Sequence, residues 1–294
     1  MSRKKSPIYA SEALRELAVA ARPADGAAFA RFQLEMLNAL EPDIRSDFLS
    51  VTLNRLDELG RVRPDFLASM VNIPPALGEH YRAVAAHDIF TTLLTHHSGM
   101  ALFSEALSPH RNMPEDFRQE VFTAAGLRWI LGISFSIPFM RDRHLTMNCI
   151  RSPDSGPYPP TLGEERAEYL LYPFFLCWLH VHGRICHDTL REWLCLCTDM
   201  SHRRFIFLRT LAGKGIATAA ALARGLGISQ GAIYRHAEIA YETYLSRCPE
   251  AVQPYDGNAN RMMTLSRAYH FLGFAPGGTS RPLPRRTFEP DEKP

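Results

Sequence analysis

A short glycine turn between two helical patterns constrains the fold of this chain more than any other feature. The stretch ATAAALARG leads into Gly225-Leu226-Gly227, and a second helical pattern runs from Gln230 to Leu245. Because the chain must reverse within that tripeptide, we expect at least one glycine at positive φ. Gly227 is the preferred position, since it precedes Ile228, which we expect to be buried, and Ser229, which can cap the next helix. Such a turn is typical of a helix-turn-helix, and also of two ordinary core helices.

The C-terminal part of the chain is predicted to contain four helices. The first is the stretch SHRRFIFLRTLAGK, and the fourth is NRMMTLSRAYHFLGF, which ends at Gly273. The helix that starts at Gln230 is expected to bury Ile233, Ala237 and Ala240 or Tyr241 on its inner face. Its outward face then carries the side chains of Gln230, Tyr234, Arg235 and Glu238.

The preceding part of the chain combines helical and strand patterns. Helices are predicted over Ala27–Leu40 and Pro75–Leu94. Dense β-branched and aromatic residues in Leu127–Phe139, followed by the alternating segment His144–Ser152, predict an antiparallel hairpin. A long helix follows, with Thr161 as the expected N-cap because Glu164 completes a capping-box pattern. We therefore expect an α+β domain, with a short antiparallel sheet packed by helices, followed by an all-α four-helix domain.

The composition along the chain predicts the domain boundaries and the cellular compartment of the protein. We expect a flexible N-terminus at 1–25, the α+β domain at 26–194, the helical domain at 200–274 and a disordered tail, rich in Pro, Gly and charge, at 275–294. The 46% hydrophobic and 22% charged residues are those of a soluble globular protein. The apolar run YLLYPFFLCWL is too short to span a bilayer, and the basic N-terminus lacks the apolar core of a secretory signal. We expect a cytoplasmic protein, without membrane contact, whose six cysteines are reduced.

The charge of the chain is unevenly distributed. Residues 200–274 contain nine Lys or Arg and four Asp or Glu, a net charge of +5, which leaves −3 for the rest of a chain whose total is +2. A locally basic segment favours contact with a polyanion.

The four predicted helices resemble the C-terminal helix-turn-helix of the LuxR/NarL superfamily of bacterial regulators. MSHRRFIFLRTLAGKG is similar to the opening helix, ALARGLGISQGAIYRHAEIAYETYL to the scaffold and recognition helices, and NRMMTLSRAYHFLG to the closing helix. The resemblance covers about the last quarter of the chain. GISQGAIYRH is also similar to the motif of TetR-type repressors, but those carry it near the N-terminus, so its position favours the LuxR type.

The chain departs from the LuxR pattern at three points. Arg204 stands where the family usually has Glu, the scaffold helix has about one extra residue, and the loop before the closing helix is longer. The segments upstream are similar to the GAF-like or autoinducer-type sensory domains that precede such units. EHYRAVAAHD is similar to an autoinducer-binding motif, but Ile89 stands where that motif has Pro, so no lactone ligand is inferred.

The resemblance implies a transcriptional regulator that binds double-stranded DNA, with a possible small-molecule effector for the sensory domain. It also implies a homodimer, for which the helix from Thr161 and the closing helix from Asn260 are the candidate interfaces. Side chains at the start of a recognition helix can reach base edges, and nearby basic side chains can contact phosphates. The candidate DNA-binding residues are Gln230, Tyr234, Arg235, His236, Arg203, Arg204, Lys214 and Arg224.

The sequence also permits two functions other than DNA binding. An interaction protein could use a degenerate helix-turn-helix to bind another protein in place of DNA. A metal- or redox-sensing module is a third alternative, suggested by a Cys- and His-rich stretch, although it lacks the spacing of a zinc site. No nucleophile elbow or phosphate-binding glycine loop is present, so we expect no enzyme, no catalytic residue, no cofactor and no metal. The residues of the Cys- and His-rich stretch are Cys177, His180, His182, Cys186, His187, Cys195 and Cys197.

Overall fold

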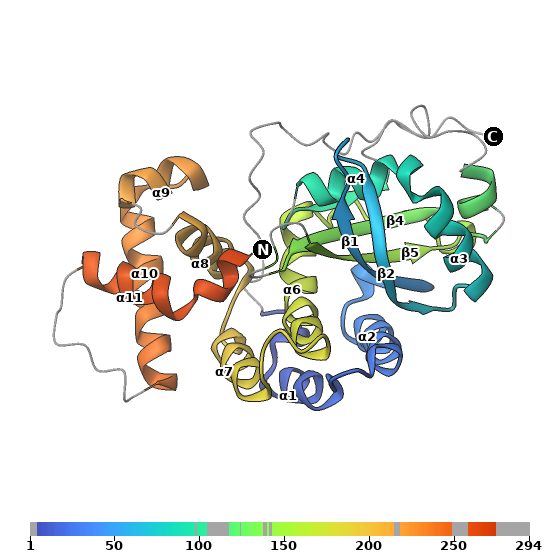
Figure 1. Ribbon diagram of the computed structural model, residues 1–294. Coiled ribbons are helices and arrows are strands. Elements are labelled where there is room, and N and C mark those ends of the chain that lie inside the picture. Colours follow the sequence, from blue (N-terminus) through green and yellow to red (C-terminus); the bar gives the residue numbers. More distant parts are fainter. Residues whose placement is uncertain are drawn as a thin grey trace. The chain divides into compact units, whose positions relative to one another are not determined.

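The computed structural model describes residues 5–97, 99–104, 118–123, 125–137, 140, 143–214, 218–248 and 258–274 (Figure 1). By their backbone contacts these residues separate into two compact units. The α/β unit contains residues 20–184, and the helical unit contains residues 5–19 and 185–274. The helical unit thus begins well before the residue 200 expected from the sequence. The tail expected to be disordered, 275–294, lies outside the described residues.

A five-stranded antiparallel sheet forms the centre of the α/β unit. The predicted hairpin is present as β4 (Trp129–Ser136) and β5 (Arg143–Arg151). Three further strands were not predicted, namely β1 (Phe48–Leu56), β2 (Val62–Val71) and β3 (Ala101–Phe103). The strand order is β2-β1-β5-β4-β3, so β5 is the middle strand. The expected α+β architecture, with a short antiparallel sheet packed by helices and followed by helices, is confirmed.

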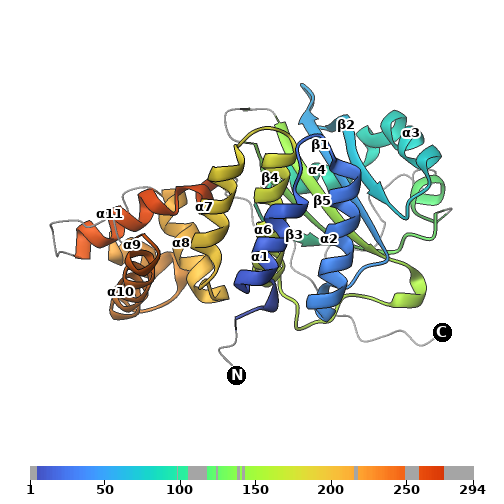
Figure 2. The same ribbon diagram turned by 90° about the horizontal axis from the view of Figure 1, so that it is seen from below.

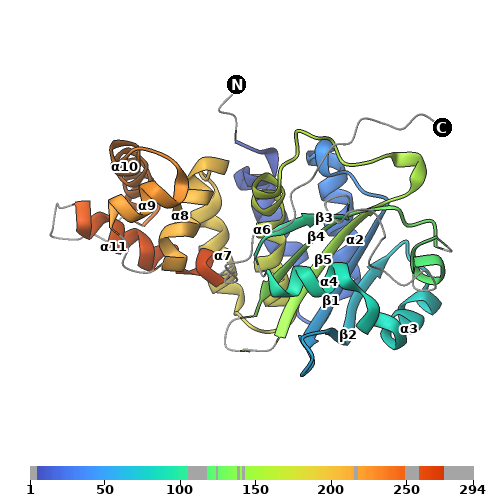
Figure 3. The ribbon, with the colours of Figure 1, turned by 90° about the horizontal axis from the view of Figure 1, so that it is seen from above.

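Helices cover both faces of this sheet. Figure 2 shows α2 (Gly26–Leu40) and α6 (Glu164–Val181) on one face, and Figure 3 shows α4 (Ile89–His96) on the opposite face, with α3 (Pro75–Val84) beside β2. The alternation of side chains along a strand assigns successive residues to opposite faces. Phe135 of β4 accordingly stacks on Phe175 of α6, at a centroid distance of 4.2 Å.

Two predicted helix boundaries are wrong. The helix expected over Pro75–Leu94 is divided, because the Asp88 side chain accepts a hydrogen bond from the backbone N–H of Thr91 at 2.9 Å and starts α4 as a new helix. The helix expected to be capped by Thr161 begins at Glu164 instead, after Gly163 as N-cap and without a side-chain cap. Leu162 is fully buried, so the chain is anchored in the core just before the helix starts.

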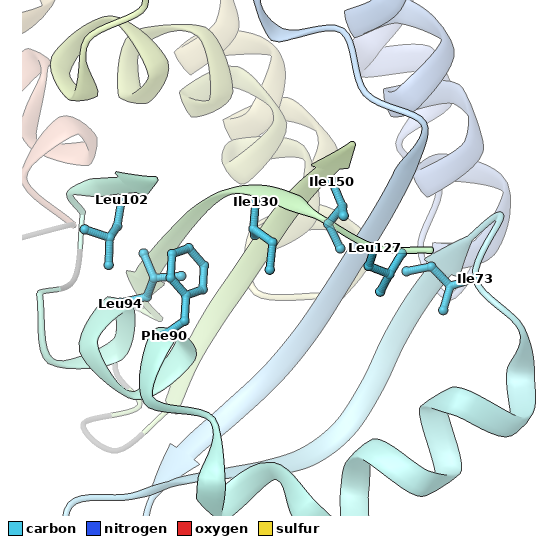
Figure 4. Packing of buried hydrophobic residues seen from close by; sticks show 7 residues of the cluster. All are labelled: Ile73, Phe90, Leu94, Leu102, Leu127, Ile130 and Ile150. Carbon is cyan, nitrogen blue, oxygen red and sulfur yellow. The ribbon is translucent and has the colours of Figure 1, made fainter. Parts of the chain in front are cut away.

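An apolar cluster joins α4 to the sheet (Figure 4). The cluster contains Phe90 and Leu94 of α4, Ile130 of β4 and Ile150 of β5. The remaining buried members of the cluster are Ile73, Leu102 and Leu127. Gly132 permits this close approach, because a Cβ there would lie 2.4 Å from Leu94 Cδ1 and 2.8 Å from Phe90 Cε1.

The helical unit contains the four predicted helices. They are α8 (His202–Lys214), α9 (Ala219–Leu226), α10 (Gln230–Arg247) and α11 (Asn258–Ala268), and a short 3-10 turn follows at His270–Phe274. The core-facing residues of α8 are buried as their spacing indicates, since Phe205, Leu208 and Leu211 are at most 1% exposed.

Two helices of this unit were not predicted. The first, α1 (Ser11–Ala20), lies within the N-terminus that was expected to be flexible. It forms because Ala13, Leu14, Leu17 and Ala18 recur at helical spacing, and all four are buried. The second, α7 (His187–Cys197), buries Leu190, Trp193 and Leu194.

Candidate nucleic-acid interface and ligand pocket

The turn between α9 and α10 has the predicted backbone geometry. Gly227 adopts φ 64° and ψ 31°, in the left-handed region, as predicted. Ile228 N–H donates to the carbonyl oxygen of Ala223 at 3.1 Å, which closes the end of α9. Ser229 then caps α10, as predicted, because its side-chain oxygen accepts from the backbone N–H of Ala232 at 3.2 Å. The reversal is therefore completed by one glycine and one serine.

The sequence predicts that the side chain of Ile228 is buried, but this prediction is wrong. The side chain is 37% exposed. The backbone N–H of Ile228 is hydrogen-bonded to the end of α9. The chain therefore reverses through this backbone hydrogen bond and does not need a buried side chain at position 228. The small core between the two helices is formed instead by Leu222 of α9 and Ile233 of α10, both fully buried.

The start of α10 exposes the predicted outward face. Gln230, Arg235 and Glu238 are exposed, and Tyr234 is 38% exposed. The opposite face is buried as predicted, since Ile233, Ala237, Ala240 and Tyr241 all contribute to the core. The N-terminal half of α10 thus displays amide, phenol and guanidinium groups to solvent.

The other candidate DNA-binding residues have different surroundings. Arg203 of α8 and Arg224 of α9 are exposed. Arg204 is half-buried, and its Nη1 donates to the carbonyl oxygen of Asp199 at 2.5 Å. The side chain of Lys214 lies outside the described residues.

His236 joins α10 to α8 within this basic group. Its half-buried ring stacks on Phe207, with centroids 5.8 Å apart and an interplanar angle of 26°. Burial lowers the pKa of His236, and the positive charges of Arg204, Arg203 and Arg235 lower it further. Three guanidinium groups from two helices therefore act electrostatically on one imidazole.

A pocket lies in the α/β unit between the sheet and α3 and α4. About 510 Å³ of space, including the part that opens to solvent, is not filled by atoms. Its apolar wall includes Ile73, Phe90, Leu127, Ile130 and Ile150. Such a cavity, apolar with a few convergent polar groups, is typical of a small-molecule site.

One polar group of this pocket lies at the junction of α3 and α4. Tyr81 Oη donates to Asp88 Oδ2 at 2.8 Å, while Asp88 Oδ1 caps α4. Burial raises the pKa of Asp88, and it also raises the pKa of Tyr81 well above its usual value. Asp88 is 3% exposed and lines the pocket with Tyr81 and Thr91.

A second polar group lies on the floor of the pocket, where β1, β5 and β4 run side by side. Asn148 Nδ2 donates to Ser50 Oγ at 3.4 Å. Behind this pair, Asn54 Nδ2 donates to the hydroxyls of Thr52 and Thr146 at 2.9 Å and 2.8 Å. Among the described residues, the buried side-chain oxygens Oδ1 of Asn54 and Asn148 have no hydrogen-bond partner. An unmet buried acceptor costs about 1–3 kcal/mol, so a ligand or water that donates to Asn148 would recover this cost.

Sequence reasoning did not identify most pocket residues. Ser50 and Thr52 were missed because β1 was not predicted, although apolar and polar residues alternate from Leu49 to Asn54. Tyr81 and Asp88 belong to the segment EHYRAVAAHD, which was singled out from the sequence without a role for either residue.

The Cys- and His-rich stretch does not form a metal centre in the described part of the chain. No group of three or more His, Cys, Asp or Glu side chains there is placed to hold a metal ion. Cys177 is fully buried in α6, whereas Cys186 and Cys195 are exposed at the start and near the end of α7. None of the described helices combines the length and apolarity needed to cross a membrane.

The described residues thus define a two-unit protein, with a pocket in its α/β unit and a helix-turn-helix in its helical unit. No family model matches the chain, and no curated protein matches it. Among solved structures, SdiA of Escherichia coli aligns over 88% of this chain and 97% of its own, at 16% identity and a TM-score of 0.37. SdiA in complex with octanoyl-rac-glycerol aligns over 92% of this chain and 98% of its own, at 15% identity and the same TM-score.

Proposed function

We propose that this chain is a DNA-binding transcriptional regulator whose α/β unit binds a small amphipathic molecule. The observation that carries the proposal is the exposed start of α10, which follows a left-handed glycine turn and a serine cap. A helix presented in this way can enter the major groove with its first two turns.

The side chains divide into two roles in this proposal. Gln230, Tyr234 and Arg235 reach base edges, because they project from the N-terminal turns of α10. Arg203 and Arg224 contact phosphates, where positive charge fixes the register of the helix without reading sequence. Arg204 acts indirectly, since its bond to the Asp199 carbonyl holds the start of α8.

Salt-dependent DNA binding tests this proposal. Affinity for a selected duplex should fall steeply with salt, as counterions are released from neutralised phosphates. Arg235→Ala should weaken specific binding by about 1–3 kcal/mol, whereas Arg203→Ala should weaken binding to all sequences and reduce the salt slope by about one. Arg267→Ala, an exposed arginine on α11, serves as the matched control.

Two results would contradict DNA recognition by α10. One is unchanged affinity in folded Arg235→Ala protein. The other is a folded wild-type chain that binds no duplex even at low salt, in which case the helix-turn-helix would serve a protein partner.

The effector proposal rests on the chemistry of the pocket. The apolar wall suits an alkyl or aromatic group, while Asp88 and the Asn148 Oδ1 atom accept hydrogen bonds. A fitting molecule is therefore small, apolar at one end and bears an N–H or O–H donor at the other.

A thermal-shift comparison tests the effector proposal. Medium-chain alkyl amides, which carry donors, should raise the melting temperature more than the matched methyl esters, which carry none. Asn148→Leu should remove this preference, and Asn38→Leu, which alters an amide outside the pocket lining, controls for general destabilisation. Equal shifts for amides and esters in wild-type protein would contradict the donor requirement.

A further inference from the structure

A stripe of residues on α7 faces the C-terminal turn of α10 within the helical unit. Glu192, Cys195 and Asp199 follow one another at three and four residues, so they share one side of α7 and its extension. Cys248 is the C-cap of α10, and its backbone N–H donates to the carbonyl oxygen of Tyr244 at 2.9 Å. The two helices are in contact.

An ion pair joins the stripe on α7 to the end of α10. Arg247 Nε donates to Asp199 Oδ2 at 3.0 Å, which ties the last residue of α10 to the end of α7. Cys248 is the next residue after Arg247, and Cys195 lies one helical turn before Asp199. The ion pair therefore brings the two cysteines to the same side of the α7–α10 contact.

Electrostatic effects agree with this placement. Burial raises the pKa of the Cys248 thiol, and the nearby Cys195 and Glu192 raise it further. The same Glu192 contributes to the raised pKa of Tyr244, one turn earlier on α10, after burial and Cys248. Side chains of α7 thus act on two successive turns of α10.

We propose that Cys195 and Cys248 form a peroxide-sensitive dithiol that closes into a disulfide between α7 and the end of α10. Cys195 is exposed and Cys248 is half-buried, so an oxidant can reach the pair. Thiol pairs in reducing compartments commonly serve as redox sensors and not as permanent crosslinks. The pair lies outside the exposed start of α10 and adds a function to the proposed DNA-binding regulator.

The chemistry requires a peroxide as oxidant. The Cys195 thiolate attacks one peroxide oxygen, an S–O bond forms, the O–O bond breaks, and hydroxide leaves and is protonated to water. The Cys248 thiolate then attacks the sulfur of the Cys195 sulfenic acid, the S–S bond forms, the S–O bond breaks, and hydroxide leaves and is protonated to a second water. Two thiols are oxidised and one hydrogen peroxide is reduced to two waters.

The other cysteines are less suited to this reaction. Cys197 is fully buried on the inner side of α7, and burial raises its pKa well above the usual value. Cys186 is exposed but precedes Cys195 by nine residues, roughly 13 Å along a helix, so it cannot replace Cys195 opposite Cys248. Cys186 is therefore the matched control.

Thiol titration of the full chain tests the proposal. After hydrogen peroxide and removal of the oxidant, the titre of the denatured protein should fall by two from the six thiols that the chain carries. Non-reducing mass spectrometry should identify a peptide pair that joins Cys195 to Cys248. Cys186→Ser should still form this pair, whereas Cys195→Ser and Cys248→Ser should not.

A second measurement uses only wild-type protein, so a folding defect of a variant cannot affect its result. A short bifunctional thiol crosslinker added to reduced wild-type protein should join Cys195 to Cys248, because a disulfide demands nearly adjacent Cβ atoms. The proposal is overturned if the crosslinker does not join this pair. It is equally overturned if peroxide converts Cys195 to sulfinic acid, or pairs it with another cysteine or another molecule, in protein that keeps Cys248.

Discussion

At the scale of single residues, Gly227 shows how one backbone angle can decide the geometry of the turn between α9 and α10. Its φ of 64° is disfavoured for residues with a Cβ, by about 1–2 kcal/mol. A Cβ at this position would meet no atom within 4 Å, so any penalty arises from the backbone and not from collision.

We predict that Gly227→Val weakens DNA binding strongly, whereas Gly227→Asn retains most of it. Valine is β-branched and resists the left-handed region, while asparagine enters it readily. Fluorescence anisotropy with a labelled duplex measures the affinities, and circular dichroism reports the helix content. Wild-type affinity in Gly227→Val protein would show that the turn does not position a DNA-reading helix.

His236 gives the helical unit a pH dependence with a definite sign. Its pKa is lowered in the folded state, so the unfolded chain binds the proton more tightly. Stability from this residue is complete above the unfolded pKa of about 6.5 and is lost as pH falls from there through the lowered folded pKa.

Urea denaturation at pH 7.5 and 5.5 should therefore show a loss of stability on acidification that is smaller in His236→Gln. An equal pH effect in wild-type and His236→Gln protein would assign the dependence to other groups.

At the scale of elements, the predictable features were those with strong local signals. The β4–β5 hairpin follows from dense β-branched residues, and α8 to α11 follow from apolar spacing and from the caps at Gly227 and Ser229. The division at Asp88 was not predicted, because the helical pattern continues on both sides of this residue. The pattern did not show that the Asp88 side chain caps a new helix. Thr161 had the right pattern for a cap, but α6 starts at Glu164, after the buried Leu162.

The packing of α4 on β4 supplies a stability prediction. Gly132→Ala would place a Cβ 2.4 Å from Leu94 Cδ1 and 2.6 Å from Asn148 Oδ1, so α4 or these side chains must shift. We expect a loss of about 1–3 kcal/mol in the free energy of unfolding, typical of overpacking. Gly163→Ala, where a Cβ meets no atom within 4 Å, is the control. In the double variant Gly132→Ala/Leu94→Ala the two losses should not add, since Leu94 is the side chain in the way.

At the scale of the whole molecule, the pocket could not be predicted from the sequence. Ser50, Asp88 and Asn148 come from three segments that only the sheet order and the placement of α4 bring together. The exposed face of α10, by contrast, lies on one helix, so periodicity alone predicted that Gln230 and Arg235 are exposed.

Assembly is a prediction at this scale as well. Of the two helices proposed as dimer interfaces, α6 is buried from Ala167 to Val181, which leaves α11. Met263 of α11 is 41% exposed, as expected of a side chain that a second copy could cover. Light scattering should detect a dimer on duplex DNA with paired half-sites, and Met263→Glu should weaken it more than Arg267→Glu. A strictly monomeric protein on such DNA would contradict the proposal.

The strand order also has a consequence for the order in which the chain can fold during its synthesis. The middle strand, β5, is the last of the five to leave the ribosome, and it alone joins the β1–β2 pair to the β3–β4 pair in the described sheet. A nascent chain that ends before Arg143 can form at most two separate strand pairs, each with an open edge where β5 is missing. Ribosome pausing before this strand would therefore prolong a state prone to aggregation, and the sheet of the α/β unit can be completed only after β5 emerges.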